Sequence, residues 1–170
     1  QILTQSQGHR EAWIHRGRIR IGWGLSRETR GQDPSDLYRS AIEDLSEAIR
    51  RESSATQAWM GRANAHIRLA AYFHKRGMEI VGPCNAALGD LEVASGLAPE
   101  DSEIGFQRAY VRSLLGSQRW TQGGNPKSDF EAALLEIERS LRLDPGWSEA
   151  WLLRGSIAGD LGLYFVGIGI

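Results

Sequence analysis

The chain has 170 residues, of which 41% are hydrophobic and 24% are charged, and its formal net charge at pH 7 is −1. This composition is typical of a folded globular protein and excludes an intrinsically disordered chain. The near-zero charge gives no general attraction for nucleic acid, and no apolar run approaches the roughly 20 residues of a membrane-spanning helix, so we expect neither nucleic-acid nor membrane partners.

Cysteine use and the two ends of the chain add little. Cys84 is the single cysteine, which excludes an intrachain disulfide bond and favours a reducing compartment such as the cytoplasm, although the compartment stays unknown. The chain begins at Gln1 and ends in an apolar segment, which suggests a piece of a longer protein.

A 46-residue period runs through the chain, with anchors at positions 13, 59, 105 and 151. The copies are Ala12-Trp13-x-x-Arg16-Gly17, Ala58-Trp59-x-x-Arg62-Ala63, Ile104-Gly105-x-x-Arg108-Ala109 and Ala150-Trp151-x-x-Arg154-Gly155. Four copies in phase indicate an internal repeat, and each copy predicts a helix around its anchor.

A second set of positions in each copy keeps the same period and predicts a second helix, because its members are three and four residues apart. They are Tyr38, Ala41 and Leu45, then Cys84, Ala87 and Leu91, then Phe130, Ala133 and Ile137. Proline at positions 99 and 145 ends two of these helices. The turns within the copies are predicted at 31–34, at Gly77 with Gly82-Pro83, and at 123–126. Each copy is therefore a helical hairpin.

This order of Trp, an aromatic residue, Ala, a large apolar residue, Ala and Pro resembles the tetratricopeptide repeat, over nearly the whole chain. The resemblance implies an all-α, right-handed solenoid of antiparallel hairpins with about seven helices. We expect a single domain over 1–170, with repeats at about 10–55, 56–101 and 102–147 and a partial fourth, terminal helix at 148–170. The period exceeds the usual 34 residues of the family, and such long-insert repeats resemble arrays in bacterial multidomain signalling proteins.

The family usually has Leu where each copy here has arginine, at Arg16, Arg62, Arg108 and Arg154. Acidic residues recur with the same period, at Asp44, Asp90 and Glu136. Since a guanidinium can bind a carboxylate through two hydrogen bonds, we interpret both sets as structural partners. Pairing within a copy, Arg16 to Asp44, and pairing between copies, Arg62 to Asp44, both fit the spacing.

The resemblance also implies a non-catalytic scaffold that binds a protein or peptide, of unknown identity, in a concave groove lined by the first helices. The candidate groove residues are Ile14, Arg18, Met60, Asn64, Arg68, Phe106 and Tyr110. The family's carboxylate clamp for chaperone C-termini needs Lys in the row of Ile14, so we do not expect a receptor for chaperone tails. The alternative is a spacer or oligomerisation module of a larger signalling protein, which would form homo-oligomers through the apolar C-terminal segment 163–170 or the long inserts.

No pattern predicts catalysis, a metal site or a cofactor. His9 and His15 are six residues apart, and His66 and His74 are eight apart, so neither pair has the spacing of a helical zinc site. The segment 123–128 lacks the Gly-Lys-Ser/Thr run of a phosphate loop. Cys84 takes the position of Tyr38 and Phe130 and is therefore interpreted as a core residue. We predict that the chain is not an enzyme.

Overall fold

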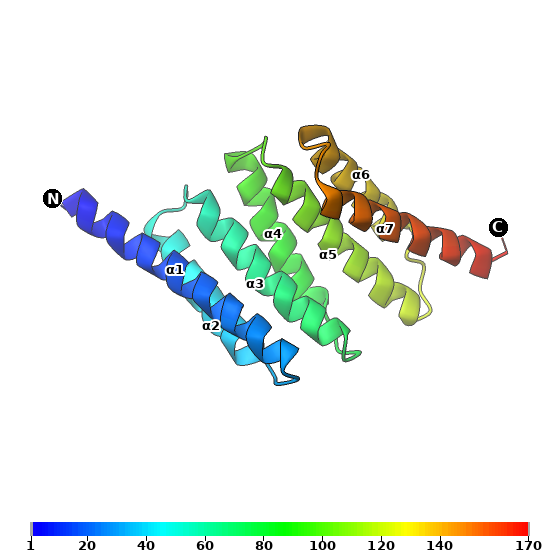
Figure 1. The fold of residues 1–170 in the computed structure, drawn as a ribbon, viewed down its shortest axis with the longest axis horizontal. Helices are drawn as coiled ribbons and strands as arrows, with labels where there is room; N and C mark the ends of the chain where they lie inside the picture. The colour runs from blue at the N-terminus through cyan, green and yellow to red at the C-terminus, as the bar shows by residue number, and fades with distance from the viewer. Residues whose placement is uncertain (1, 170) are drawn as a thin grey trace.

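The structure is a computed structural model that describes the backbone of residues 2–169 and the side chains of residues 10–169. The described residues form seven helices and no strand: α1 (Ile2–Thr29), α2 (Ser35–Arg51), α3 (Thr56–His74), α4 (Val81–Leu97), α5 (Ser102–Thr121), α6 (Lys127–Leu143) and α7 (Ser148–Gly167) (Figure 1). None of these helices is both long and apolar enough to span a membrane.

The helices stack as antiparallel hairpins, α1 with α2, α3 with α4 and α5 with α6, and α7 packs against α5 and α6. The helices α3, α5 and α7 begin at residues 56, 102 and 148, and α2, α4 and α6 begin at residues 35, 81 and 127. Equivalent helices therefore begin 46 residues apart in the structure as well. This confirms the predicted all-α solenoid of helical hairpins.

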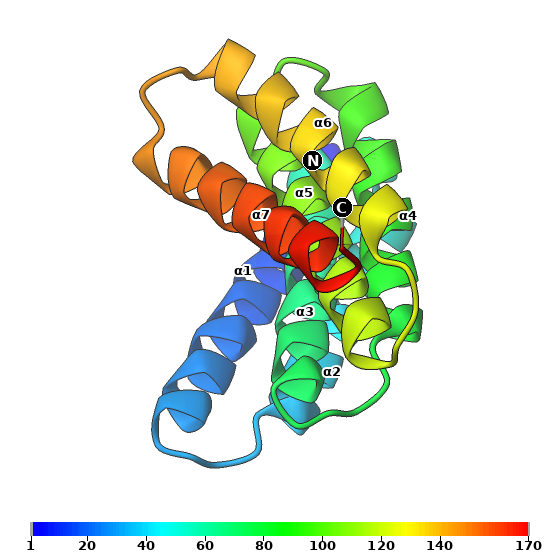
Figure 2. The ribbon, with the colours of Figure 1, turned by 90° about the vertical axis from the view of Figure 1, so that its right-hand side faces the viewer.

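The stack has two layers. In Figure 1, α1, α3, α5 and α7 run across the near side and α2, α4 and α6 lie behind them. The first helices contact one another along the stack, whereas α2, α4 and α6 make no such contacts with each other over the described residues. Figure 2 shows α1 and α7 pointing in different directions, so the hairpins rotate along the stack. The first helices therefore form the inner, more closely spaced layer.

The turn inside each hairpin depends on a glycine at one repeat position. Gly31, Gly77 and Gly123 have φ angles of +72°, +65° and +78°, a region that L side chains rarely adopt. After Gly77, the N–H of Met78 donates to the carbonyl of Phe73 at 3.0 Å, and the turns after α1 and α5 repeat this bond. This arrangement satisfies carbonyls that the end of a helix leaves free.

The second turn differs from the prediction in one respect. Gly82 and Pro83 do not belong to it, because α4 already begins at Val81. Proline is tolerated in the first turn of a helix, where a backbone N–H has no partner within the helix. The turn therefore depends on Gly77, and Gly82-Pro83 starts the next helix instead of breaking the chain.

The two helices of a hairpin approach most closely where a small residue faces a large one. Gly116 of α5 faces Phe130, and a Cβ built on this glycine would lie 2.8 Å from Phe130 Cε1. Gly24 faces Tyr38 in the same way, so a Cβ there would overlap the tyrosine ring. In the middle hairpin the residues at these positions are Ala70 and Cys84, which share one core cluster. Where the second helix has the smaller Cys84 instead of an aromatic ring, the first helix has alanine instead of glycine.

Candidate functional site

The periodic arginines contact the acids of their own hairpin. Arg62 Nε lies 2.9 Å from Asp90 Oδ2, and Arg62 Nη2 lies 2.6 Å from Asp90 Oδ1. Arg16 and Asp44 form the same pair of bonds at 2.9 and 2.6 Å. In the third hairpin, a single bond of 2.8 Å joins Arg108 Nε to Glu136 Oε1. Of the two pairings that the spacing allows, the structure contains the one within the hairpin.

The same guanidinium groups also reach back to the preceding hairpin. Arg62 Nη1 donates to Ser46 Oγ at 2.9 Å, and Arg108 Nη1 lies 2.6 Å from Glu92 Oε2. Arg154, whose hairpin has no second helix among the described residues, keeps only the backward contact, at 3.5 Å from Glu138. An internal arginine therefore joins three helices, which supports the interpretation of these residues as structural.

In the three copies that have a tryptophan anchor, the indole ring lies beside the arginine. The guanidinium carbon of Arg62 lies 5.0 Å from the centroid of the Trp59 ring, a cation–π geometry that recurs for Arg16 on Trp13 and Arg154 on Trp151. The indole N–H of Trp59 donates to the carbonyl of Ser53 at 2.8 Å. The tryptophan thus connects the start of the hairpin to the preceding loop and supports the arginine on its ring.

His66 occupies the repeat position of Arg20 and Arg112. Arg20 Nη1 lies 2.8 Å from Asp44 Oδ2, so this position adds a second cation beside the buried acid. Burial lowers the pKa of His66, Asp90 acts in the opposite direction, and Arg62 adds to the lowering. Because its pKa in the folded chain is below the unfolded value, His66 stabilises the fold above about pH 6.5 and loses this contribution as the pH falls.

We expect His66→Arg to weaken the pH dependence of stability, because arginine stays charged in both states and can pair with Asp90 as Arg20 pairs with Asp44. The measurement is the urea concentration at the midpoint of unfolding, at about pH 7.5 and at about pH 5.5. The decrease of this midpoint from pH 7.5 to pH 5.5 should be smaller in His66→Arg than in the wild type. His15→Arg, at an exposed histidine of α1, is the control and should leave the drop unchanged. An equal decrease of the midpoint in all three proteins would show that His66 does not cause the pH dependence of stability.

The first helices enclose a hollow of about 430 Å³, here termed the inner groove. It is lined by Arg18, Ile21, Gln57, Met60, Gly61, Asn64, Asp101, Glu103 and Gln107. The structure thus brings together three of the predicted groove residues, Arg18 from α1 and Met60 and Asn64 from α3. The groove has a positive charge from Arg18 on the α1 side and negative charges from Asp101 and Glu103 on the α5 side. The side-chain amides of Gln57, Asn64 and Gln107 also line it.

The other predicted groove residues lie elsewhere. Ile14 is only 5% exposed and packs in the core of the first hairpin. The ring of Phe106 stacks on Trp147, with centroids 4.6 Å apart. Tyr110 is half-buried against the second core cluster, and Arg68 is exposed on α3 outside the groove. Ile14 and Phe106 are therefore engaged in packing, whereas Met60, in the same row, lines the inner groove.

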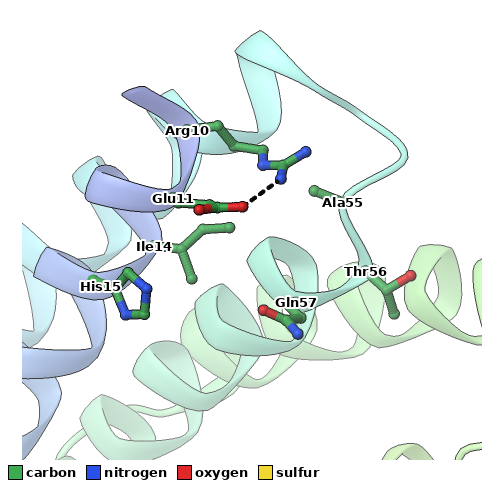
Figure 3. Close-up of a pocket in the computed structure, with 7 residues that line it drawn as sticks. All are labelled: Arg10, Glu11, Ile14, His15, Ala55, Thr56 and Gln57. Atoms are coloured by element: carbon green, nitrogen blue, oxygen red, sulfur yellow. Dashed lines mark hydrogen bonds and ion pairs between the residues drawn. The ribbon is translucent and has the colours of Figure 1, made fainter. Parts of the chain in front are cut away.

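A second hollow, of about 460 Å³, lies between α1 and the start of α3. Figure 3 shows Ile14 and His15 of α1 on one side of it and Gln57 of α3 on the other. Arg10 lies at its edge, where it binds Glu11 and Glu52. Because Gln57 lines both hollows, they adjoin along the inner layer.

Six lining residues of the inner groove were not among the predicted candidates, and Gln107 and Asp101 show two reasons for this. Gln107 lies four residues after Glu103 on α5, and its Nε2 donates to Glu103 Oε1 at 2.9 Å. Gln107 Oε1 is buried without a hydrogen-bond partner in the described structure. Extending the helical rows to the second position after each anchor would have found Gln107. Asp101 precedes α5 in a loop, and only the tertiary structure brings it to the groove.

Comparison with solved structures identifies the architecture. The first tetratricopeptide (TPR) domain of human RPAP3 matches with a TM-score of 0.60 and 19% identity, over 88% of this chain and 94% of that one. The second TPR domain of human RPAP3, in complex with an HSP70 peptide, matches with a TM-score of 0.59 and 19% identity, over 88% of this chain and 98% of that one. This chain has the fold of a tetratricopeptide repeat domain.

A third tetratricopeptide structure, the first TPR of Spaghetti (RPAP3) bound to an HSP90 peptide, matches with a TM-score of 0.53 and 19% identity, over 87% of this chain and 94% of that one. No family model matches the sequence, and no curated protein matches it. The tetratricopeptide likeness is thus one of fold.

Proposed function

We propose that this chain is a non-catalytic scaffold that binds an extended peptide segment of a protein partner in the inner groove. The observation that carries the proposal is the convergence of Arg18, Met60 and Asn64 on one hollow of about 430 Å³. Two of the similar tetratricopeptide structures were solved with peptides, SGPTIEEVD of HSP70 and SRMEEVD of HSP90. We further propose that the array belongs to the long-insert class found in bacterial signalling proteins.

The lining of the groove suits a peptide. The side-chain amides of Gln57, Asn64 and Gln107 can both donate to and accept from a peptide backbone. Met60 and Ile21 add apolar surface for a side-chain anchor. The charge difference along the groove favours a peptide that places a basic residue near Asp101 and Glu103 and an acidic residue near Arg18.

Acidic C-terminal tails of the chaperone type are not the proposed ligands. The row that would have to supply a lysine contains Ile14, Met60, Phe106 and Leu152. A tail ending in Glu-Glu-Val-Asp would also place several negative charges near Asp101 and Glu103. We expect the peptide SRMEEVD to bind with a dissociation constant above about 1 mM in a calorimetric titration, which corresponds to a binding free energy less favourable than about −4 kcal/mol. Micromolar binding would contradict this choice of ligand class.

The groove is tested with peptides selected from a random-sequence display library on the whole chain. We expect Asn64→Ala and Arg18→Glu each to weaken binding of the selected peptides about tenfold or more, because these residues would contact the peptide directly. Asn85→Ala and Arg39→Glu are matched controls at exposed positions of the outer helices α4 and α2. They should leave the affinity unchanged.

The outcome separates the groove from other surfaces. Loss of binding in the two groove variants alone supports the proposal. Equal affinities in all four variants would place binding outside the inner groove and would contradict it. Circular dichroism of each variant shows whether the helices remain folded.

A further inference from the structure

A buried glutamine joins the third hairpin to the turn of the second. Gln118 lies near the end of α5 and is only 7% exposed. Its Nε2 donates to the carbonyl of Met78 at 3.2 Å, and its Oε1 accepts from the N–H of Ile80 at 3.3 Å. Both backbone groups belong to the turn between α3 and α4. We call this pair of hydrogen bonds the Gln118 latch.

The sequence explains why an amide stands at this junction. Ile80 is fully buried, and because it precedes the first residue of α4, its N–H needs an acceptor from outside that helix. The equivalent turn residues of the other two hairpins have no N–H, since they are prolines, Pro34 and Pro126. The residues equivalent to Gln118 carry a ring instead of an amide, Tyr72 and Tyr164. The amide of Gln118 therefore goes with the turn whose buried N–H has to be satisfied.

The latch is remote from the inner groove but fixes a helix that forms part of it. Glu103 and Gln107, in the first half of α5, line the groove together with Asn64 of α3. Gln118 follows Gln107 by three helical turns, about 16 Å along the axis, so it lies beyond the reach of a peptide in the groove. A tilt of α5 by about 10° around its first residue would move Gln107 by about 1 Å relative to α3. The latch opposes such a tilt.

The other contacts at this junction hold α5 in place without fixing its far end. Ile104, Val111 and Leu114 of α5 pack in one core cluster with residues of α3 and α4, so α5 stays attached when the latch is removed. Arg108 Nη1 lies 2.6 Å from Glu92 Oε2, but the side chain of Glu92 is 74% exposed, and exposed ion pairs contribute little. Helices α4 and α5 also contact each other less extensively than α2 and α3 do. Loss of the latch should therefore loosen the tilt of α5 without unfolding the chain.

We propose that Gln118 is a positioning residue of the inner groove, which fixes the tilt of α5 and thereby the separation of Gln107 from Asn64. This inference rests on the proposed peptide-binding function of the groove. A groove that is held at its binding geometry beforehand loses less conformational freedom when the peptide binds. The coupling is reciprocal, so a latch that strengthens peptide binding is itself strengthened by the bound peptide, by the same factor.

The first test needs no variant. Hydrogen exchange at the amide of Ile80 is followed by NMR in the intact chain, with and without a peptide selected on that chain. We expect the peptide to slow this exchange about threefold or more, although the latch does not touch the groove. The control is the amide of Gly124 in the turn of the third hairpin, which donates to the carbonyl of Arg119 and should not change.

Two results of the exchange measurement would overturn the proposal. One is an equal exchange rate at Ile80 with and without the peptide. The other is equal slowing at Ile80 and Gly124, because the peptide would then stabilise the whole chain instead of the latch.

The second test removes the latch. Gln118→Met eliminates both hydrogen bonds and keeps a side chain of similar length. We expect it to bind the selected peptides about threefold more weakly or more, and its Ile80 amide to exchange about tenfold faster. Gln122→Met, the same substitution at the exposed residue after α5, is the matched control and should leave both quantities unchanged. If circular dichroism shows that Gln118→Met does not fold, the exchange measurement on the wild type decides alone.

The groove variant Asn64→Ala separates this inference from the proposed function. Weaker binding in both Asn64→Ala and Gln118→Met, with Gln122→Met unchanged, supports both. Weaker binding in Asn64→Ala alone leaves the groove as the binding site and overturns the role of Gln118. If neither variant changes the affinity, the proposed function fails and the inference fails with it.

Discussion

Arg62→Leu is expected to lower the free energy of unfolding by about 3 kcal/mol, although leucine is the usual residue of tetratricopeptide repeats at this position. The side chain of Asp90 is only 6% exposed, and Arg62 supplies the two hydrogen bonds that compensate its burial. Without the guanidinium, a nearly buried carboxylate has lost its main partner. Urea unfolding followed by circular dichroism measures the loss.

The double variant Arg62→Leu with Asp90→Ala should recover most of that stability, because removing both partners leaves no buried charge. Arg154→Leu is the matched control at the same repeat position. Over the described residues, Arg154 pairs with no carboxylate from a following helix, and its contact with Glu138 is half-exposed, so the change should cost less than about 1 kcal/mol. A double variant that is less stable than Arg62→Leu alone would contradict the pairing as the source of the effect.

Gly24→Ala is expected to destabilise the first hairpin by about 1 to 3 kcal/mol, although alanine favours helices more than glycine does. The added methyl group would overlap the ring of Tyr38, which is fully buried and has little room to move. Gly22→Ala on the same helix meets no atom within 4 Å and should instead stabilise the chain by about 0.5 to 1 kcal/mol. Thermal and urea unfolding should therefore give changes of opposite sign for the two variants.

The middle hairpin suggests a rescue. It contains Ala70 and Cys84 at the positions of Gly24 and Tyr38. We expect Tyr38→Cys to cost less in the Gly24→Ala background than in the wild type, because the methyl group then occupies space that the ring has left. Costs that simply add would show that the two positions do not compensate each other.

The sequence predicted the helices well because their signals are local. The three- and four-residue spacing of Tyr38, Ala41 and Leu45 specifies one helix face. Gly31 and its equivalents in the next two copies, Gly77 and Gly123, each mark a turn. The misplaced breaker at Gly82-Pro83 shows the limit of this reasoning. A proline in the first turn of a helix and a proline in a loop leave the same signal in the sequence.

The structure brings only some of the candidate groove residues together. Arg18, Met60 and Asn64 line one hollow, because rows counted from each anchor stay on one side of a helix, but whether they bind a ligand stays a prediction. Ile14 and Phe106 share the row of Met60 but pack in the core and on Trp147, because the rotation between hairpins decides whether a residue of this row faces solvent or the next hairpin. Sequence spacing within one helix contains no information about that rotation.

The sequence by itself determined the repeat, the helical hairpins and the small residues that allow their close packing, since these depend on residue type and on spacing within a helix. Only the tertiary structure decided which acid each arginine binds. Asp44 and Ser46 are two residues apart and therefore point in nearly opposite directions from α2, so Asp44 faces Arg16 of its own hairpin and Ser46 faces Arg62 of the next. The orientation of α2 between its two neighbours makes that choice, because it turns one side of the helix toward α1 and the other toward α3.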